Sequence, residues 1–180
     1  MANKIDNISV HEISYDLKRT VMDFFQASPM EVSELKETGS YALLDANGEV
    51  VRKLPLRKAF QIIGNDVLKN VLGKKVWCNL CYTRAFTNPN EVIVITGIRL
   101  LEEINFFLHT APQDYDVIVV KVERTGWEDP QPSNHVTEME VDLIDEDVLI
   151  QAKDMDELTI KADEFIPYLM DKVREEKQVW

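Results

Sequence analysis

Two arginines lie at or near the ends of predicted strands, which is where open α/β sheets bind their ligands. Arg99 follows the β-branched run 92–96, and Gly97 is the residue that breaks this run. Arg124 stands in a long polar loop together with Trp127. A guanidinium recognises phosphate through paired donors, and an indole ring offers a flat face for stacking. The pattern predicts an anion site, with a local ion pair as the alternative role for Arg99.

A third cation, Lys18, falls in the first turn of a helix that is predicted to begin near Asp16. A positive charge at this end of a helix opposes the helix dipole unless an anion is nearby. Lys18 is therefore a candidate anion contact, and simple solvent exposure is the alternative. The inward face of this helix is expected to hold Leu17, Val21, Phe24 and Phe25.

Cys78 and Cys81 form a C-x-x-C segment, which in other contexts is a redox motif or half of a zinc site. The alternative is two small apolar side chains on one helix, because Trp77, Leu80 and Tyr82 surround them. The sequence holds no other cysteine, and its three histidines are scattered. These observations favour the structural interpretation.

The residues around Arg99 predict a strand–helix–strand unit. Residues 92–96 carry no charge, which is typical of a strand buried on both faces, and helical spacing follows over 99–108. Residues 116–122 form a second apolar strand, and a right-handed connection would place 117–122 beside 92–96 in parallel. We therefore expect an α/β fold, a three-layer sandwich with a small, mostly parallel sheet.

The remaining segments carry shorter signals. Ser28-Pro-Met-Glu31 has the residue order of a capped helix start, and Asp45-Ala-Asn-Gly48 predicts the turn of an exposed hairpin flap. Pro55 is expected to open a helix that Gly64 ends. Further predictions are a strand over 8–14, helices ending at Gly73 and over 74–86, a helix over 135–143, a strand over 147–150, and a helix over 154–166 that Pro167 kinks or ends.

Size and charge narrow the classes of function. A chain of 180 residues fits one domain, and its net charge of -12 argues against direct nucleic-acid binding and against an anionic membrane surface. No apolar run approaches the roughly 20 residues of a membrane span, and residues 1–9 lack the apolar core of a signal peptide. We therefore expect a cytoplasmic protein, in the host cytoplasm if a phage encodes it.

Taken in order, several motifs resemble those of the deoxynucleoside monophosphate kinases of tailed bacteriophages, which have the P-loop kinase fold. Ser14-Tyr-Asp-Leu-Lys18 is similar to that family's F-A-D-P-L-K, and the segment 55–66 followed by Trp77 is similar to P-R-x-x-L-Q-x-x-G-T-D…W. Residues 95–103 resemble T-D-V-R-F-x-N-E, 119–124 resemble V-x-V-x-R, and 133–138 resemble H-x-S-E. The likeness covers residues 8–166 of a single kinase-like domain, 1–180, in which 167–180 form a helical tail.

Two departures concern the ATP side of such a kinase. Members of the family open with a strand, a Walker A loop and a helix, and the likeness begins just after that unit. The only Gly-Lys pair is Gly73-Lys74, with Leu68 and Lys75 where a Walker A loop needs glycine and a hydroxyl. Gly97 stands where the family has an aspartate that would help to position magnesium. We therefore expect a truncated P-loop-kinase-like fold that holds neither metal nor cofactor.

The resemblance implies a nucleotide site on the monophosphate side. It places Lys18, Arg57, Arg99 and Arg124 around a phosphate, with Trp127 or Trp77 available to stack on a base. His135 and Glu138 match a pair that the family keeps near its lid. The alternative is that these side chains are remnants of the fold that are held in local ion pairs.

Three functions follow from this comparison. The first is a non-catalytic, kinase-like phage protein that binds a deoxynucleoside monophosphate or a signalling nucleotide as a regulator or a sponge. The second is an acidic interaction protein that inhibits a host protein involved in defence or DNA binding. The third is an active deoxynucleoside monophosphate kinase with an unorthodox ATP site. A homodimer is one way in which the tail 168–180 could cover an exposed sheet edge.

Overall fold

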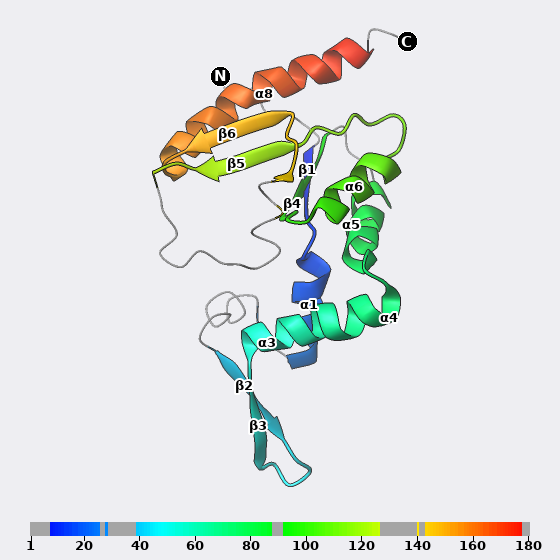
Figure 1. Cartoon of the computed structure of the whole chain (residues 1–180), viewed down its shortest axis with the longest axis vertical. Coiled ribbons are helices and arrows are strands. Elements are labelled where there is room, and N and C mark those ends of the chain that lie inside the picture. The colour runs from blue at the N-terminus through cyan, green and yellow to red at the C-terminus, as the bar shows by residue number, and fades with distance from the viewer. Residues whose placement is uncertain are drawn as a thin grey trace. The chain divides into compact units, whose positions relative to one another are not determined.

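The computed structural model describes residues 8–25, 28, 39–87, 92–126, 140 and 143–177. It is a mixed α/β structure whose contacts divide the chain into two compact units (Figure 1). One unit is Ser9–Ile98, and the other joins Arg99–Trp180 with Met1–Ile8. The α/β prediction is confirmed, including the small parallel sheet.

Strands β1 (Ile8–Glu12) and β4 (Val92–Thr96) form a two-stranded sheet. The amide of Ile13 donates to the carbonyl oxygen of Thr96 at 3.0 Å, so the carboxyl ends of the two strands lie side by side. The strand predicted over 92–96 is therefore present. The prediction that both faces of this strand are buried is wrong, because its first four residues are partly exposed and Thr96 is exposed.

Helix α1 (Tyr15–Phe25) follows β1 directly and packs against helices α3 and α5. Val21 is fully buried, as predicted for the inward face. Phe24 was predicted to share that face but is 71% exposed. Tyr15, Thr20 and Asp23 are exposed on this helix, and Oγ1 of Thr20 donates to the Asp16 carbonyl at 2.7 Å.

A continuous helical stretch runs through α3 (Leu56–Gln61), the π-helix η1 (Ile62–Lys69) and α4 (Asn70–Leu72). The prediction that Gly64 ends a helix is therefore wrong. A Cβ at Gly64 would meet Cδ2 of Leu17 at 3.0 Å, so this glycine provides room for close packing. Gly73 does end the stretch, with φ of 101°.

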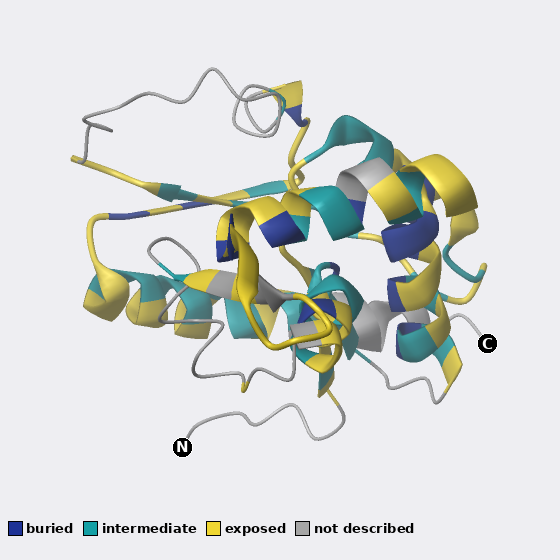
Figure 2. Cartoon of the chain, turned by 90° about the horizontal axis from the view of Figure 1, so that it is seen from below, coloured by how far each residue is buried: buried dark blue, intermediate teal, exposed yellow. Residues whose placement is uncertain are grey.

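Helix α5 (Val76–Thr87) supplies much of the core of its unit (Figure 2). Cys78 and Cys81 are both buried on it as free thiols. Burial raises the pKa of Cys81 to about 11, so its thiol stays protonated and is a poor nucleophile. The structural interpretation of the C-x-x-C segment therefore fits these surroundings. The buried apolar residues of this unit's core are Ile13, Val21, Leu54, Leu56, Ala59, Val76, Trp77, Cys78, Cys81 and Ala85.

The predicted hairpin is present as β2 (Ser40–Leu44) and β3 (Val50–Pro55), which pair antiparallel. Asp45 closes its turn, because Oδ1 accepts the amides of Asn47 at 2.8 Å and Glu49 at 2.9 Å. Gly48 adopts φ of 84°, which favours glycine in such turns. The first four residues of β3 are exposed, as expected of a flap.

The second unit contains a parallel pair, β5 (Val120–Arg124) and β6 (Val148–Ala152), in which Val122 faces Ile150. Among the strands of the described residues, β5 pairs with β6 and β4 pairs with β1, so the predicted pairing of 117–122 with 92–96 is not observed. Strand β5 instead pairs in parallel with β6, which comes later in the chain.

Two helices complete the second unit, α6 (Leu101–Thr110) and α8 (Met155–Lys177). Helix α8 packs on β6 (Figure 1), and its start is capped because Oδ1 of Asp154 accepts the amide of Glu157 at 2.9 Å. Pro167 lies inside α8, so the helix does not end at this residue, and a kink there stays a prediction. The tail predicted over 168–180 continues the same helix as far as Lys177.

None of the helices in the described part of the chain combines the length and apolar composition needed to cross a bilayer. Several predicted features lie outside the described residues. They are most of the helix that begins at Ser28, most of the helix over 135–143, and the side chains of Trp127, His135 and Glu138.

Candidate functional site

Polar side chains gather where β1 and β4 end and α1 begins. Oε1 of Glu12 accepts hydrogen bonds from Oγ of Ser14 at 2.6 Å and from Nζ of Lys18 at 2.5 Å. Lys18 lies in the first turns of α1, as the sequence predicted, and its amide donates to the carbonyl of Ser14 at 2.9 Å. The ammonium of Lys18 therefore binds an anionic oxygen at the carboxyl end of this sheet.

Arg84, on helix α5, contacts the same region. Its guanidinium forms an ion pair with Asp16, and Nη2 donates to the main-chain carbonyl of Glu12 at 2.8 Å. The guanidinium carbon also lies 4.7 Å from the centre of the Tyr15 ring. Sequence reasoning missed Arg84, although it is the single charged residue in the twelve-residue helix α5. An isolated charge on an otherwise uncharged helix was the sequence feature that could have identified Arg84 as a candidate site residue.

Gly97 borders the cluster from the end of β4. Its φ is 77°, and a Cβ built on it would lie 3.5 Å from Cγ of Glu12 and 3.6 Å from Cγ2 of Ile13. The side chain of Glu12 therefore stands beside the Cβ position of residue 97. The carboxyl end of this sheet carries a carboxylate, which β1 supplies.

His11 lies in β1, immediately before Glu12. Burial, and secondly the positive charge of Arg84, lower the pKa of its imidazole below the ordinary value of 6.5. Its Nε2 is buried and has no hydrogen-bond partner among the described residues. The imidazole therefore stays neutral near pH 7, and the cationic groups of this cluster are Lys18 and Arg84.

Arg99 lies in the other unit, two residues before the first residue of α6. Its amide and that of Leu100 donate to Oε2 of Glu103 at 3.1 and 3.3 Å, and the amide of Leu101 donates to Oε2 of Glu140 at 3.0 Å. The side chain of Arg99 is exposed, while the helix start beside it is already satisfied by two carboxylates. Glu140 was not predicted, because its contact with Leu101 spans 39 residues of sequence.

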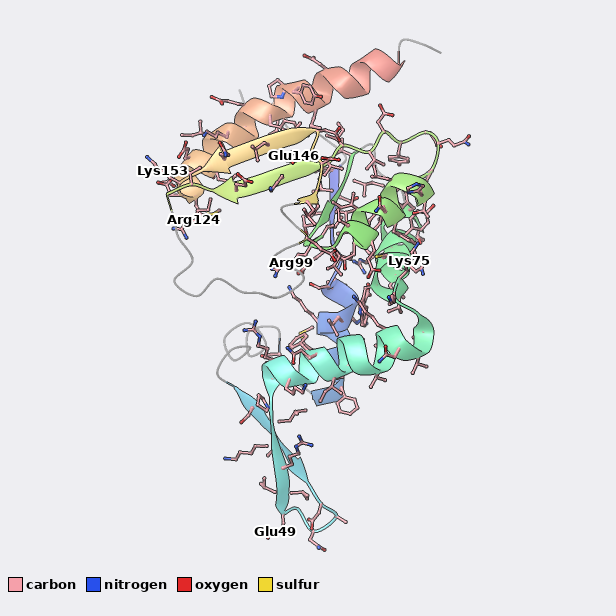
Figure 3. All side chains as sticks on the ribbon, viewed as in Figure 1. Glu49, Lys75, Arg99, Arg124, Glu146 and Lys153 are labelled. Carbon is pink, nitrogen blue, oxygen red and sulfur yellow. The ribbon has the colours of Figure 1, made fainter. Side chains whose placement is uncertain are left out.

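Arg124 ends β5, and Lys153 follows the end of the neighbouring strand β6 (Figure 3). Nε of Arg124 donates to the carbonyl of Lys153 at 3.4 Å, and both side chains are exposed. The carboxyl end of this parallel pair therefore carries two cations. Sequence reasoning identified the first and missed the second, which stands one residue beyond β6.

The remaining predicted site residues have different outcomes. Arg57 is exposed on α3, in the same unit as Lys18. Trp77 was an alternative stacking residue, but it is only 6% exposed and its indole bonds to Gly64, so that role is wrong. Because Arg99 and Arg124 belong to the other unit, one pocket that unites all four cations stays a prediction.

A small sheet with a helix starting at its carboxyl end defines an α/β protein, and the carboxyl ends of the strands are where open α/β sheets as a class bind their ligands. The model of the family described as deoxynucleotide monophosphate kinase matches residues 4–162. The chain belongs to the deoxynucleotide monophosphate kinase family. The comparisons with curated proteins and with solved structures gave no match.

Proposed function

We propose that this chain binds a deoxynucleoside 5′-monophosphate and does not transfer a phosphoryl group to it. The observation that carries the proposal is the place of Lys18 at the carboxyl ends of β1 and β4, where its ammonium pairs with the Glu12 carboxylate. This lysine also lies in the segment, Ser14 to Lys18, that resembles a motif of the family. A phosphate is the anion that a nucleotide would bring to such a position.

Further contacts to the nucleotide follow from the family resemblance. We infer that Arg57, Arg99 and Arg124 contribute to phosphate binding, because guanidinium groups suit bidentate contacts with phosphate. Trp127, His135 and Glu138 are assigned to the base or to the lid on the same grounds.

The non-catalytic part of the proposal rests on sequence. These 180 residues contain no G-x-x-x-x-G-K-[ST] segment, whose amides and lysine hold the phosphates of ATP in P-loop kinases. Gly97 also replaces the aspartate that would help to position magnesium. Binding without turnover suits a regulator of a nucleotide pool or a sponge for a signalling nucleotide, working in the cytoplasm of a phage-infected cell.

Binding is tested by isothermal titration with each of the common deoxynucleoside monophosphates, with an ATP-consumption assay beside it. We expect saturable binding of at least one of these nucleotides and no ATP consumption. Turnover of about 1 per second, in a preparation free of host kinases, would instead establish an active kinase with an unorthodox ATP site. The absence of binding by every nucleotide would refute the proposal.

Two substitutions assign the binding to named side chains. Lys18→Met and Arg99→Ala each remove one charge-assisted contact of roughly 1.5–3 kcal/mol, so each should lower affinity by about 10- to 100-fold. Lys58→Met is the matched control, because Lys58 is an exposed lysine of α3 outside the proposed site. Equal losses in Lys58→Met and Lys18→Met would show that only net charge matters.

The acidic interaction protein remains the second candidate because of helix α8. Four of its acidic residues recur at helical spacing and are exposed, namely Asp156, Asp163, Glu164 and Asp171. Such a stripe suits a basic surface of a host protein. The test is retention of host proteins by the immobilised chain, with loss of a retained partner when Asp163→Asn and Glu164→Gln are combined.

A further inference from the structure

The Glu12 carboxylate holds the position that an incoming anion would need. Two donors converge on its Oε1 atom, the hydroxyl of Ser14 at 2.6 Å and the ammonium of Lys18 at 2.5 Å. A hydroxyl and an ammonium that share one acceptor oxygen form the kind of donor set that binds a phosphate oxygen. The first turn of α1 adds the positive end of its helix dipole to the same place.

The surroundings of Glu12 allow its side chain to leave. The side chains of Lys18 and Glu12 are 42% and 37% exposed, so solvent and a small ligand reach the ion pair. Gly97 has no side chain that would confine Glu12 on its other side, since its Cβ position lies 3.5 Å from Cγ of Glu12. Nη2 of Arg84 donates to the main-chain carbonyl of Glu12, so the backbone is held at this residue when the side chain moves.

We propose that Ser14 and Lys18 form a phosphate-binding site that the Glu12 carboxylate occupies until a nucleotide displaces it. The inference rests on the proposed function and adds Ser14 as a ligand contact and Glu12 as an internal competitor. A phosphomonoester is the ligand class that displaces a carboxylate most readily, because it carries about two negative charges and three acceptor oxygens. A half-exposed ion pair is weak enough to be exchanged in this way.

The substitution Glu12→Gln distinguishes a Glu12 that competes with the ligand from a Glu12 that only positions Lys18. Glu12→Gln keeps the shape of the side chain and removes its charge. If Glu12 competes with the ligand, this change frees Lys18 and removes repulsion of the phosphate, so affinity rises. If Glu12 only orients Lys18 for binding, the same change lowers affinity.

The experiment is isothermal titration of inorganic phosphate and of deoxythymidine 5′-monophosphate into the wild type and its variants. Glu12→Gln should bind both anions more tightly, by about threefold or more, and Ser14→Ala should bind both more weakly. The matched control is Asp23→Asn, which removes an equal charge from the exposed pair of Asp23 with Arg19 on the same helix. The control should leave both affinities close to those of the wild type.

Each result is decisive. Wild-type binding with no gain in Glu12→Gln over Asp23→Asn overturns the inference and leaves the proposed function standing. No binding by any of the proteins overturns both. If Glu12→Gln does not fold, Glu12→Asp replaces it, because the shorter carboxylate no longer reaches both donors and should likewise raise affinity; no gain there overturns the inference.

Discussion

The indole Nε1 of Trp77 donates a hydrogen bond to the carbonyl oxygen of Gly64, with 3.3 Å between the two atoms. The bond joins the π-helix η1 to the start of α5 across 13 residues of sequence. Gly64 and Trp77 both belong to the segments that resemble the family's paired helices. Their role in this structure is to fix how these helices pack, which explains why Trp77 is unavailable to a base.

We predict that Trp77→Phe lowers the free energy of unfolding by about 1–3 kcal/mol, because it leaves the Gly64 carbonyl without its indole donor in a buried place and removes part of a buried ring. Urea denaturation followed by circular dichroism measures this loss. Thr83→Ala is the control, since it removes an exposed hydrogen bond to the Asn79 carbonyl on the same helix. A loss no greater than that of the control would contradict the prediction.

Arg84 should contribute to stability through its ion pair with Asp16 and its bond to the Glu12 carbonyl. Because the Arg84 and Asp16 side chains are 26% and 25% exposed, we expect Arg84→Gln to cost about 1–2 kcal/mol of unfolding free energy. Asp16→Asn combined with Arg84→Gln should cost less than the sum of the single changes, which a double-mutant cycle measures. Arg19→Gln, in an exposed pair, is the control, and strict additivity of the first pair would refute the contact.

His11 should make stability depend on pH below neutrality. Burial and the charge of Arg84 lower its pKa in the folded chain below 6.5, so the unfolded chain binds more protons at lower pH. Stability due to this residue is therefore fully present above pH 6.5 and is lost as the pH falls from 6.5 through the lowered pKa of the folded chain. Replacing His11 with Gln should reduce this loss. Titration of the His11 ring by NMR checks the cause, because Arg84→Gln should raise the pKa of His11.

Local patterns in the sequence predicted those parts of the fold that depend on neighbouring residues. The β-branched run 92–96, the turn closed by Asp45 and the helix capped by Asp154 were each found in this way. The end assigned to Gly64 was wrong because that glycine is required by Leu17, a tertiary neighbour that no local pattern shows. Helical spacing alone also placed Phe24 on the inward face of α1, whereas its side chain is 71% exposed.

The candidate site was predicted only in part for the same reason. Lys18 was found because a cation at the start of a helix is unusual in itself. Arg84 and Asp16 are separated by 68 residues, and nothing in the sequence indicates that they meet. The resemblance to a kinase family came from the order of several short motifs, which is a signal that survives even where single residues such as Gly97 depart from the pattern.

Gly97 offers a direct test of the carboxylate at the end of the sheet. Its φ of 77° costs an L-residue about 1–2 kcal/mol, and Asn and Asp tolerate such a conformation best. Gly97→Asp would introduce the aspartate that the family resemblance implies at this position and would place a second carboxylate beside Glu12, whereas Gly97→Asn has the same shape without the charge. We therefore expect Gly97→Asp to be less stable than Gly97→Asn, and Glu12→Gln to abolish the difference. Urea denaturation of the four proteins measures this coupling. Equal stability of the Asp and Asn variants in the presence of Glu12 would mean that the Glu12 carboxylate lies away from position 97.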